Sequence, residues 1–76
     1  MNSMGMKITV KVVFNSTKDS WEHFGNNRYL LKLSYPEDDG AMMIVKEYIS
    51  RQIGVPGSKI AFQGKDMRGN WTFEVL

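Results

Sequence analysis

The chain has 76 residues, no cysteine, a formal net charge of +2 at pH 7 and 42% hydrophobic residues. This length allows one small domain, and the apolar fraction is typical of a chain that folds around a single core. The absence of cysteine excludes disulfides, thiolate nucleophiles and cysteine metal ligands. A net charge this small does not by itself indicate a nucleic-acid-binding protein, whose basic residues would have to cluster on one face.

No apolar run approaches the roughly 18 residues that a transmembrane helix needs. The N-terminus also lacks the apolar core of a secretory signal peptide. We therefore expect no membrane association and a cytoplasmic or nuclear location. Residues 1–5 are predicted to be a flexible tail and residues 6–76 a single domain.

The first predicted element is a strand at residues 7–14, where polar and apolar residues alternate. Its inward side chains are expected to be Ile8, Val10, Val12 and Phe14. A second strand is predicted at residues 28–35, with Tyr29, Leu31, Leu33 and Tyr35 facing inward. We expect the two strands to form a hairpin, because no helical period separates them.

The connection between these strands, residues 15–27, is longer than the roughly two to five residues of most hairpin loops. Asn26 and Asn27 tolerate left-handed backbone conformations and can close a tighter turn near the second strand. In that case part of residues 19–24 continues the ladder irregularly or forms a bulge. We expect the segment to fold back as a lid in which Trp21 and Phe24 shield one edge of the core. A solvent-facing binding loop is the alternative.

A helix is predicted at about residues 41–53. Glu37, Asp38 and Asp39 precede it, where carboxylates stabilise the positive end of the helix dipole or cap its free amides. Gly54 is expected to end the helix in a left-handed conformation, and Pro56 prevents its continuation. The inward stripe of the helix consists of Ala41, Met42, Val45, Tyr48, Ile49 and Ile53.

Two more strands are predicted at residues 59–63 and 71–76, with a polar turn between them. The resulting β-β-α-β-β order predicts a two-layer α+β fold of β-grasp type, in which a four-stranded mixed sheet packs on one helix. The crossover through the helix would place the first and last strands side by side and parallel in the centre of the sheet.

The segment 45–73 resembles the ubiquitin-like family. Val45-Lys46 and Ile49 match its helix pattern, and Gly54-Val55-Pro56 is similar to its turn after the helix. Residues 60–67 look like its third strand and glycine-lysine turn, and Thr72-Phe73 stands where the family usually has Thr-Leu. The resemblance implies a small protein-interaction module. Because the chain has no C-terminal Gly-Gly, attachment to a target lysine is not expected, and Ala61 stands at the centre of the family's recognition patch.

A second resemblance, to the YggU-like family of unknown function, covers nearly the whole chain. Residues 31–41 are similar to a strand that ends in Pro-x-x-x-Gly before a helix, and residues 54–58 fit the turn that follows the helix. Met42 replaces that family's asparagine, and its Ser-Arg-x-Lys segment is not reproduced in residues 67–71. This alternative implies the same α+β class and an association with nucleic acid.

No catalytic group is indicated by the sequence. His23 is the single histidine, and its only sequence-near carboxylate is its neighbour Glu22, whereas a general base needs a positioned partner and a substrate pocket. The acidic residues 37–39 do not have the spacing of a calcium loop. We therefore expect no enzymatic activity, no cofactor and no metal.

Alternate strand residues are expected to form a mildly basic, non-aromatic outer face, which is the predicted contact surface. An acidic protein surface is the expected partner of a monomer, because RNA-binding sheets generally present aromatic side chains to the bases. Nucleic-acid binding and a solvated face without a partner are the alternatives. The predicted partner-binding residues are Lys11, Lys32, Lys59, Ala61, Gln63 and Lys65.

Overall fold

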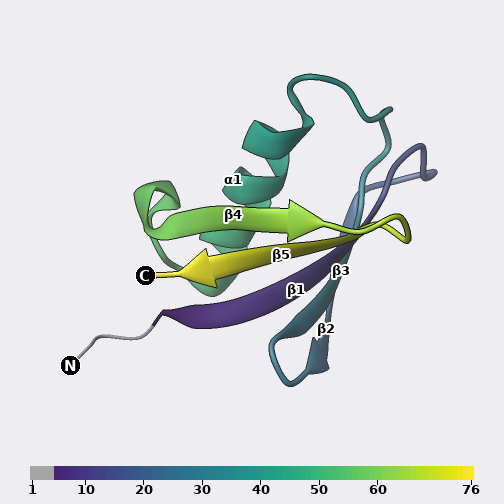
Figure 1. Ribbon diagram of the computed structural model, residues 1–76. Helices are drawn as coiled ribbons and strands as arrows, with labels where there is room; N and C mark the ends of the chain where they lie inside the picture. Colours follow the sequence, from purple (N-terminus) through teal and green to yellow (C-terminus); the bar gives the residue numbers. More distant parts are fainter. Residues whose placement is uncertain (1–4) are drawn as a thin grey trace.

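The computed structural model describes residues 5–76, so the predicted tail lies outside the described residues except for Gly5. One helix packs against one face of a five-stranded mixed sheet, which makes an α+β fold (Figure 1). The helix α1 spans Ala41–Ile53, and the short 3-10 helix η1, Gly57–Lys59, leads into the fourth strand. The strands are β1 (Met6–Val13), β2 (Ser20–Gly25), β3 (Arg28–Lys32), β4 (Ile60–Lys65) and β5 (Asn70–Val75).

The sheet order is β2-β3-β1-β5-β4, with β1 in the centre. The predicted general class is confirmed, but the sheet has five strands and not the predicted four. The additional strand is β2, which occupies part of the segment that the sequence predicted to be a lid. A tight turn joins it to β3 through Asn26 and Asn27, both left-handed with φ of 52° and 59°.

The additional strand also reverses the direction of the strands that follow it. β1 pairs with β3 in parallel, where a hairpin was predicted, and with β5 in antiparallel fashion, where a parallel pair was predicted. The first and last strands are neighbours as expected, but their predicted orientation was wrong. The physical reason is that the chain passes from β1 to the edge of the sheet and turns back as β3, which adds one reversal. The observed order is therefore β-β-β-α-β-β.

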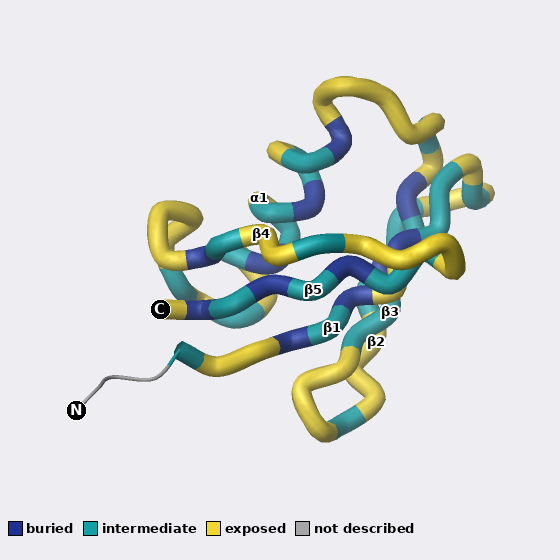
Figure 2. Tube along the Cα trace, viewed as in Figure 1, coloured by how far each residue is buried: buried dark blue, intermediate teal, exposed yellow. Residues whose placement is uncertain are grey.

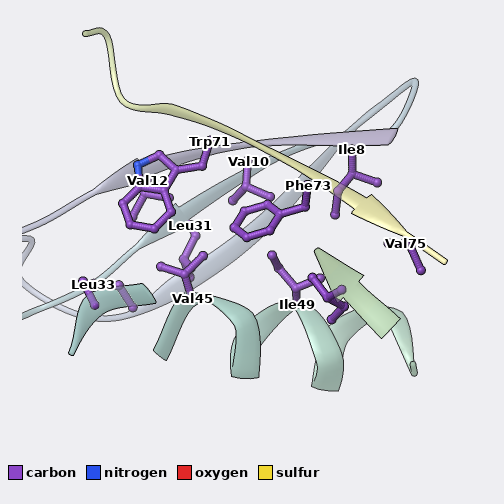
Figure 3. Close-up of a cluster of buried hydrophobic side chains, with 12 residues drawn as sticks. Ile8, Val10, Val12, Leu31, Leu33, Val45, Ile49, Trp71, Phe73 and Val75 are labelled. Atoms are coloured by element: carbon purple, nitrogen blue, oxygen red, sulfur yellow. The ribbon is translucent and has the colours of Figure 1, made fainter. Parts of the chain in front are cut away.

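The core lies between α1 and one face of the sheet, and we call this face the covered face (Figures 2 and 3). Val45 and Ile49 point from the helix toward Leu31 and Phe73 of the sheet (Figure 3). The predicted inward residues of the first strand and of the helix are confirmed as buried or as packed at the margin of the core. The buried side chains are Ile8, Val10, Val12, Leu31, Leu33, Ala41, Val45, Ile49, Ile60, Trp71, Phe73 and Val75.

The ends of the helix differ in how well they follow the prediction. Gly54 ends α1 with φ of 83°, and its N–H donates to the carbonyl of Ser50 over 2.9 Å, as the sequence predicted. At the other end, the carboxylate of Asp38 accepts a hydrogen bond from the N–H of Gly40 at 2.9 Å, one residue before the helix begins. Asp38 therefore closes the turn that leads into α1 and does not cap its first amides.

Asp19, in the connection between β1 and β2, fastens that connection to the rest of the domain. Its carboxylate accepts hydrogen bonds from the Tyr48 hydroxyl at 2.6 Å and from the Ser34 N–H at 2.8 Å. These two bonds lower the pKa of Asp19, the Tyr48 bond having the larger effect. The bond to Asp19, together with partial burial, raises the pKa of Tyr48 to about 12. The carboxylate thus links α1 to the loop that precedes β2.

The two aromatic residues of the predicted lid have different fates. Trp21 is half-buried against the core, and its ring centroid lies 4.9 Å from that of Tyr29. Phe24 is 62% exposed, so the prediction that it shields the core was wrong. Within residues 5–76, no helix has the length and apolar character needed to cross a membrane.

A basic hollow on the open face of the sheet

The face of the sheet opposite α1 carries no helix among residues 5–76, and we call it the open face (Figure 1). Strand alternation places on it the residues that lie between the buried positions of each strand. The central three strands contribute Lys7, Thr9, Lys11 and Val13 from β1, Arg28, Leu30 and Lys32 from β3, and Asn70, Thr72 and Glu74 from β5.

A hollow of about 390 Å³ lies on this face across β3, β1 and β5. The pairing register brings its lining together, because Lys11 lies beside both Leu30 and Asn70 and Thr9 lies beside Arg28. Three lining residues are cations, and no carboxylate from the described part of the chain lines the hollow. We call this site the basic hollow; its residues are Thr9, Lys11, Phe24, Arg28, Tyr29, Leu30, Arg68 and Asn70.

Phe24 reaches the hollow because β2 is irregular. The register between β2 and β3 shifts between His23 and Gly25, so Phe24 lies at a bulge in the ladder. On the covered side of the same hairpin, the ring of Tyr29 stacks on His23 with a centroid distance of 4.6 Å and also contacts Trp21. These contacts fix the hairpin, and the exposed phenyl ring of Phe24 is therefore held at the hollow and not left on a loose loop.

Arg68 is supplied by the turn between β4 and β5, which the carboxylate of Asp66 organises. This carboxylate accepts hydrogen bonds from the N–H groups of Arg68 at 2.8 Å and Asn70 at 2.9 Å, and from the Asn70 side-chain amide at 2.9 Å. The bonds from Asn70 are the main reason that the pKa of Asp66 is lowered. The Val12 N–H also donates to the Gly69 carbonyl at 2.9 Å, which docks the turn on β1.

Gly69 itself explains why the turn can approach β1 so closely. Its φ is 89°, and a Cβ there would lie 3.1 Å from the Val12 carbonyl oxygen. A larger residue would be strained by its backbone conformation and crowded by the neighbouring strand. The turn thus has one backbone geometry, and that geometry places Arg68 at the rim of the basic hollow.

The carboxylates on the open-face positions of β5 and β2, Glu74 and Glu22, do not line the hollow. Glu74 is paired with Lys7 near the far end of β1, and it accepts a hydrogen bond from the Gln63 amide at 2.9 Å. Glu22 lies on the edge strand β2, opposite Leu30. Neighbouring like charges on a sheet repel one another. The lining of the hollow is therefore positively charged, with Asp66 as a partial counter-charge beside Arg68, and a bound anion would neutralise it further.

The predicted contact residues do not share one surface. Lys11 lines the basic hollow, and Lys32 lies on the open face two residues farther along β3 than Leu30. Ala61 and Gln63 belong to the other edge strand, β4, and Lys59 to η1 just before it. Lys65 lies on the covered side, where its Nζ is 5.0 Å from the ring centroid of Trp71 and 2.6 Å from the Glu37 carboxylate.

The predicted contact residues did not include Phe24, Arg28 or Arg68, although a solvent-facing binding loop containing Phe24 was the alternative to the lid. The signal for Phe24 was the Asn26-Asn27 pair, which marks a tight turn and so requires a strand before it. The expectation of a non-aromatic outer face was also wrong, because Phe24 of β2 lines the hollow on the open face. Arg68 could be placed only once the Asp66 turn was known.

The described part of the chain holds no cluster of three or more His, Cys, Asp or Glu side chains suited to a metal ion. His23, the single histidine, is exposed and stacks on Tyr29. The comparisons with known proteins found no matching family model, curated protein or solved structure. The resemblances to the ubiquitin-like and YggU-like families therefore stay predictions.

Proposed function

We propose that this protein is a small non-catalytic binding module that holds an anionic macromolecule on its open face. The observation that carries this proposal is the basic hollow, whose lining includes three cations and no carboxylate from residues 5–76. A solvated sheet face with scattered charges is common, so charge alone would be a weak argument. Here hydrogen bonds to Asp66 hold the turn that carries Arg68, and the β2–β3 hairpin holds Phe24 and Arg28, so the site has a defined geometry.

Two classes of partner fit this electrostatic pattern. A protein-interaction module of ubiquitin-like type would dock the acidic surface of another protein. A module of YggU-like type would contact the phosphates of a nucleic acid. In both cases the attraction depends on exposed cations, and the binding therefore weakens as salt screens the charges.

The test is charge reversal inside the hollow. Binding of the purified protein to a fluorescent single-stranded oligonucleotide and to a fluorescent glutamate-rich peptide is measured by anisotropy at low and moderate salt. At ~50 mM salt, where phosphate contacts are strong, we expect binding to at least one probe. Arg28→Glu should weaken that binding by roughly tenfold or more, because it removes one charge contact and adds a repulsive one.

Lys46→Glu, on α1, is the matched control because it changes the net charge by the same amount away from the open face. We expect it to alter the affinity far less than Arg28→Glu. The proposal fails if neither probe binds at low salt, or if the two substitutions weaken binding equally.

A further inference from the structure

We infer that the anionic partner is a single-stranded nucleic acid, with one base stacked on Phe24 and its phosphates held by Lys11, Arg28 and Arg68. This inference depends on the proposed function of the open face and adds the class of its partner.

The exposed aromatic ring is the feature that distinguishes a nucleic acid from an acidic protein. Phe24 is 62% exposed, whereas the other two phenylalanines of the sheet are 36% exposed (Phe62) and completely buried (Phe73). An acidic peptide needs cations but gains nothing specific from a phenyl ring beside them. Proteins that bind single strands combine a positively charged groove with aromatic side chains on which bases stack. The basic hollow holds both features within one site.

The rest of the lining suits a base and its phosphates. Leu30 supplies a half-exposed apolar floor beside Lys11, and Thr9 lies beside Arg28 as a neutral hydroxyl donor. One N–H of the Asn70 side-chain amide donates to Asp66, which orients the amide, so its second N–H and its carbonyl oxygen remain for hydrogen bonds with a base. Arginine and lysine side chains donate hydrogen bonds to phosphate oxygens.

A single strand is preferred because its bases are free to leave their neighbours and stack on a protein ring. In a duplex the bases are paired and stacked on one another, so Phe24 would have no base to contact.

A second copy of this chain is a poor occupant of the hollow. Two open faces brought together would set Lys11, Arg28 and Arg68 against the same cations of the other copy, which is repulsive.

The experiment compares four probes of equal length, each of about ten nucleotides or residues. They are a single-stranded oligonucleotide, its duplex, an abasic strand with the same phosphates but no bases, and a glutamate-rich peptide. We expect the full-length protein to bind the single strand most tightly. The abasic strand and the duplex should bind more weakly, because neither offers a free base to Phe24.

Phe24→Ala should weaken binding of the single strand by roughly tenfold, the usual effect of removing one stacked base contact. It should leave binding of the abasic strand unchanged, and Phe24→Tyr, which keeps a ring, should retain most of the affinity. Because the side chain is largely exposed, the melting temperature of Phe24→Ala should stay close to that of the wild type. The salt dependence should change in Arg28→Glu and not in Phe24→Ala.

Two results would overturn the inference while leaving the proposed function intact. One is tighter binding of the glutamate-rich peptide than of the single strand, lost in Arg28→Glu. The other is an affinity for the single strand that Phe24→Ala does not change. If none of the probes binds, both the inference and the proposed function are wrong.

Discussion

The two faces of this sheet are built from alternate residues of the same strands, yet they have opposite physical roles. On β1, the residues Ile8, Val10 and Val12 are buried under α1 on the covered face. Their neighbours Thr9 and Lys11 line the basic hollow on the open face. Burial of apolar area stabilises the fold by about 25 cal/mol per Å², whereas exposed surface residues contribute little. The covered face therefore determines stability and leaves the open face free to carry cations that repel one another.

The largest effect on stability is expected from truncating a phenylalanine on the covered face, which tests whether that face determines stability. Phe73→Ala removes a completely buried ring, and such a change typically costs ~3–5 kcal/mol in the free energy of unfolding. A single core of this size supplies no more than about the same amount. We expect the variant to be largely unfolded at physiological temperature, as measured by circular dichroism.

The matched control is Thr72→Ala, because Thr72 is the neighbour of Phe73 on β5 and lies on the open face. Its free energy of unfolding should change by about 0.5 kcal/mol or less, as is usual for surface positions. If Phe73→Ala melts like the wild type, or if Thr72→Ala is equally destabilised, the division between the two faces is wrong.

A smaller effect is expected from acid, because two carboxylates, those of Asp19 and Asp66, have a lowered pKa. Asp19 is bonded to Tyr48 and Asp66 to Asn70, and both pKa values lie below the ordinary value of 3.8. A carboxyl group whose pKa is lower in the folded state stabilises the fold above the unfolded-state pKa and loses this effect as the pH falls through the folded-state pKa. The melting temperature should therefore begin to fall as the pH drops toward the ordinary value of 3.8 and should keep falling below it.

The variants Asp19→Asn and Asp66→Asn should each lose part of this pH dependence in thermal melts. Binding at neutral pH separates the two carboxylates. Asp66→Asn loosens the turn that holds Arg68 and should lower the affinity for the single-stranded probe by a few-fold. Asp19→Asn should leave that affinity unchanged, because Asp19 is hydrogen-bonded to Ser34 and Tyr48, neither of which lines the basic hollow. Equal affinities of the two variants would show that the Asp66 turn does not position Arg68 for binding.

The features that the sequence predicted correctly are those set by short-range patterns. The apolar period of the helix and the glycine at position 54 fixed its bounds, and the alternation of β1 identified its buried side chains. β2 was not predicted as a strand of the sheet, only as a possible irregular extension of the ladder, because Ser20–Gly25 lacks such alternation and has aromatic residues on both of its faces. It is a strand because β3 pairs with it and Tyr29 packs on Trp21 and His23.

The candidate site could not be predicted as a whole because it depends on that strand and on one turn. Because β2 was not counted as a strand of the sheet, the predicted direction of β3 and the predicted position of Phe24 were wrong. Arg68 lies 40 residues after Arg28 in the sequence, and only the Asp66 turn and the pairing of β5 with β1 bring the two to one site. Long-range pairing of this kind leaves no local pattern in the sequence.

The most direct test of the central claim is the location of the binding surface in solution. The backbone amide signals of the labelled protein would be followed by nuclear magnetic resonance while the single-stranded oligonucleotide is added. We predict that the shifted signals cluster at Lys11, Phe24, Arg28, Arg68 and Asn70, with α1 unaffected. The account would be contradicted if the shifted signals were concentrated on α1 or along β4 while the signals of the basic hollow did not move.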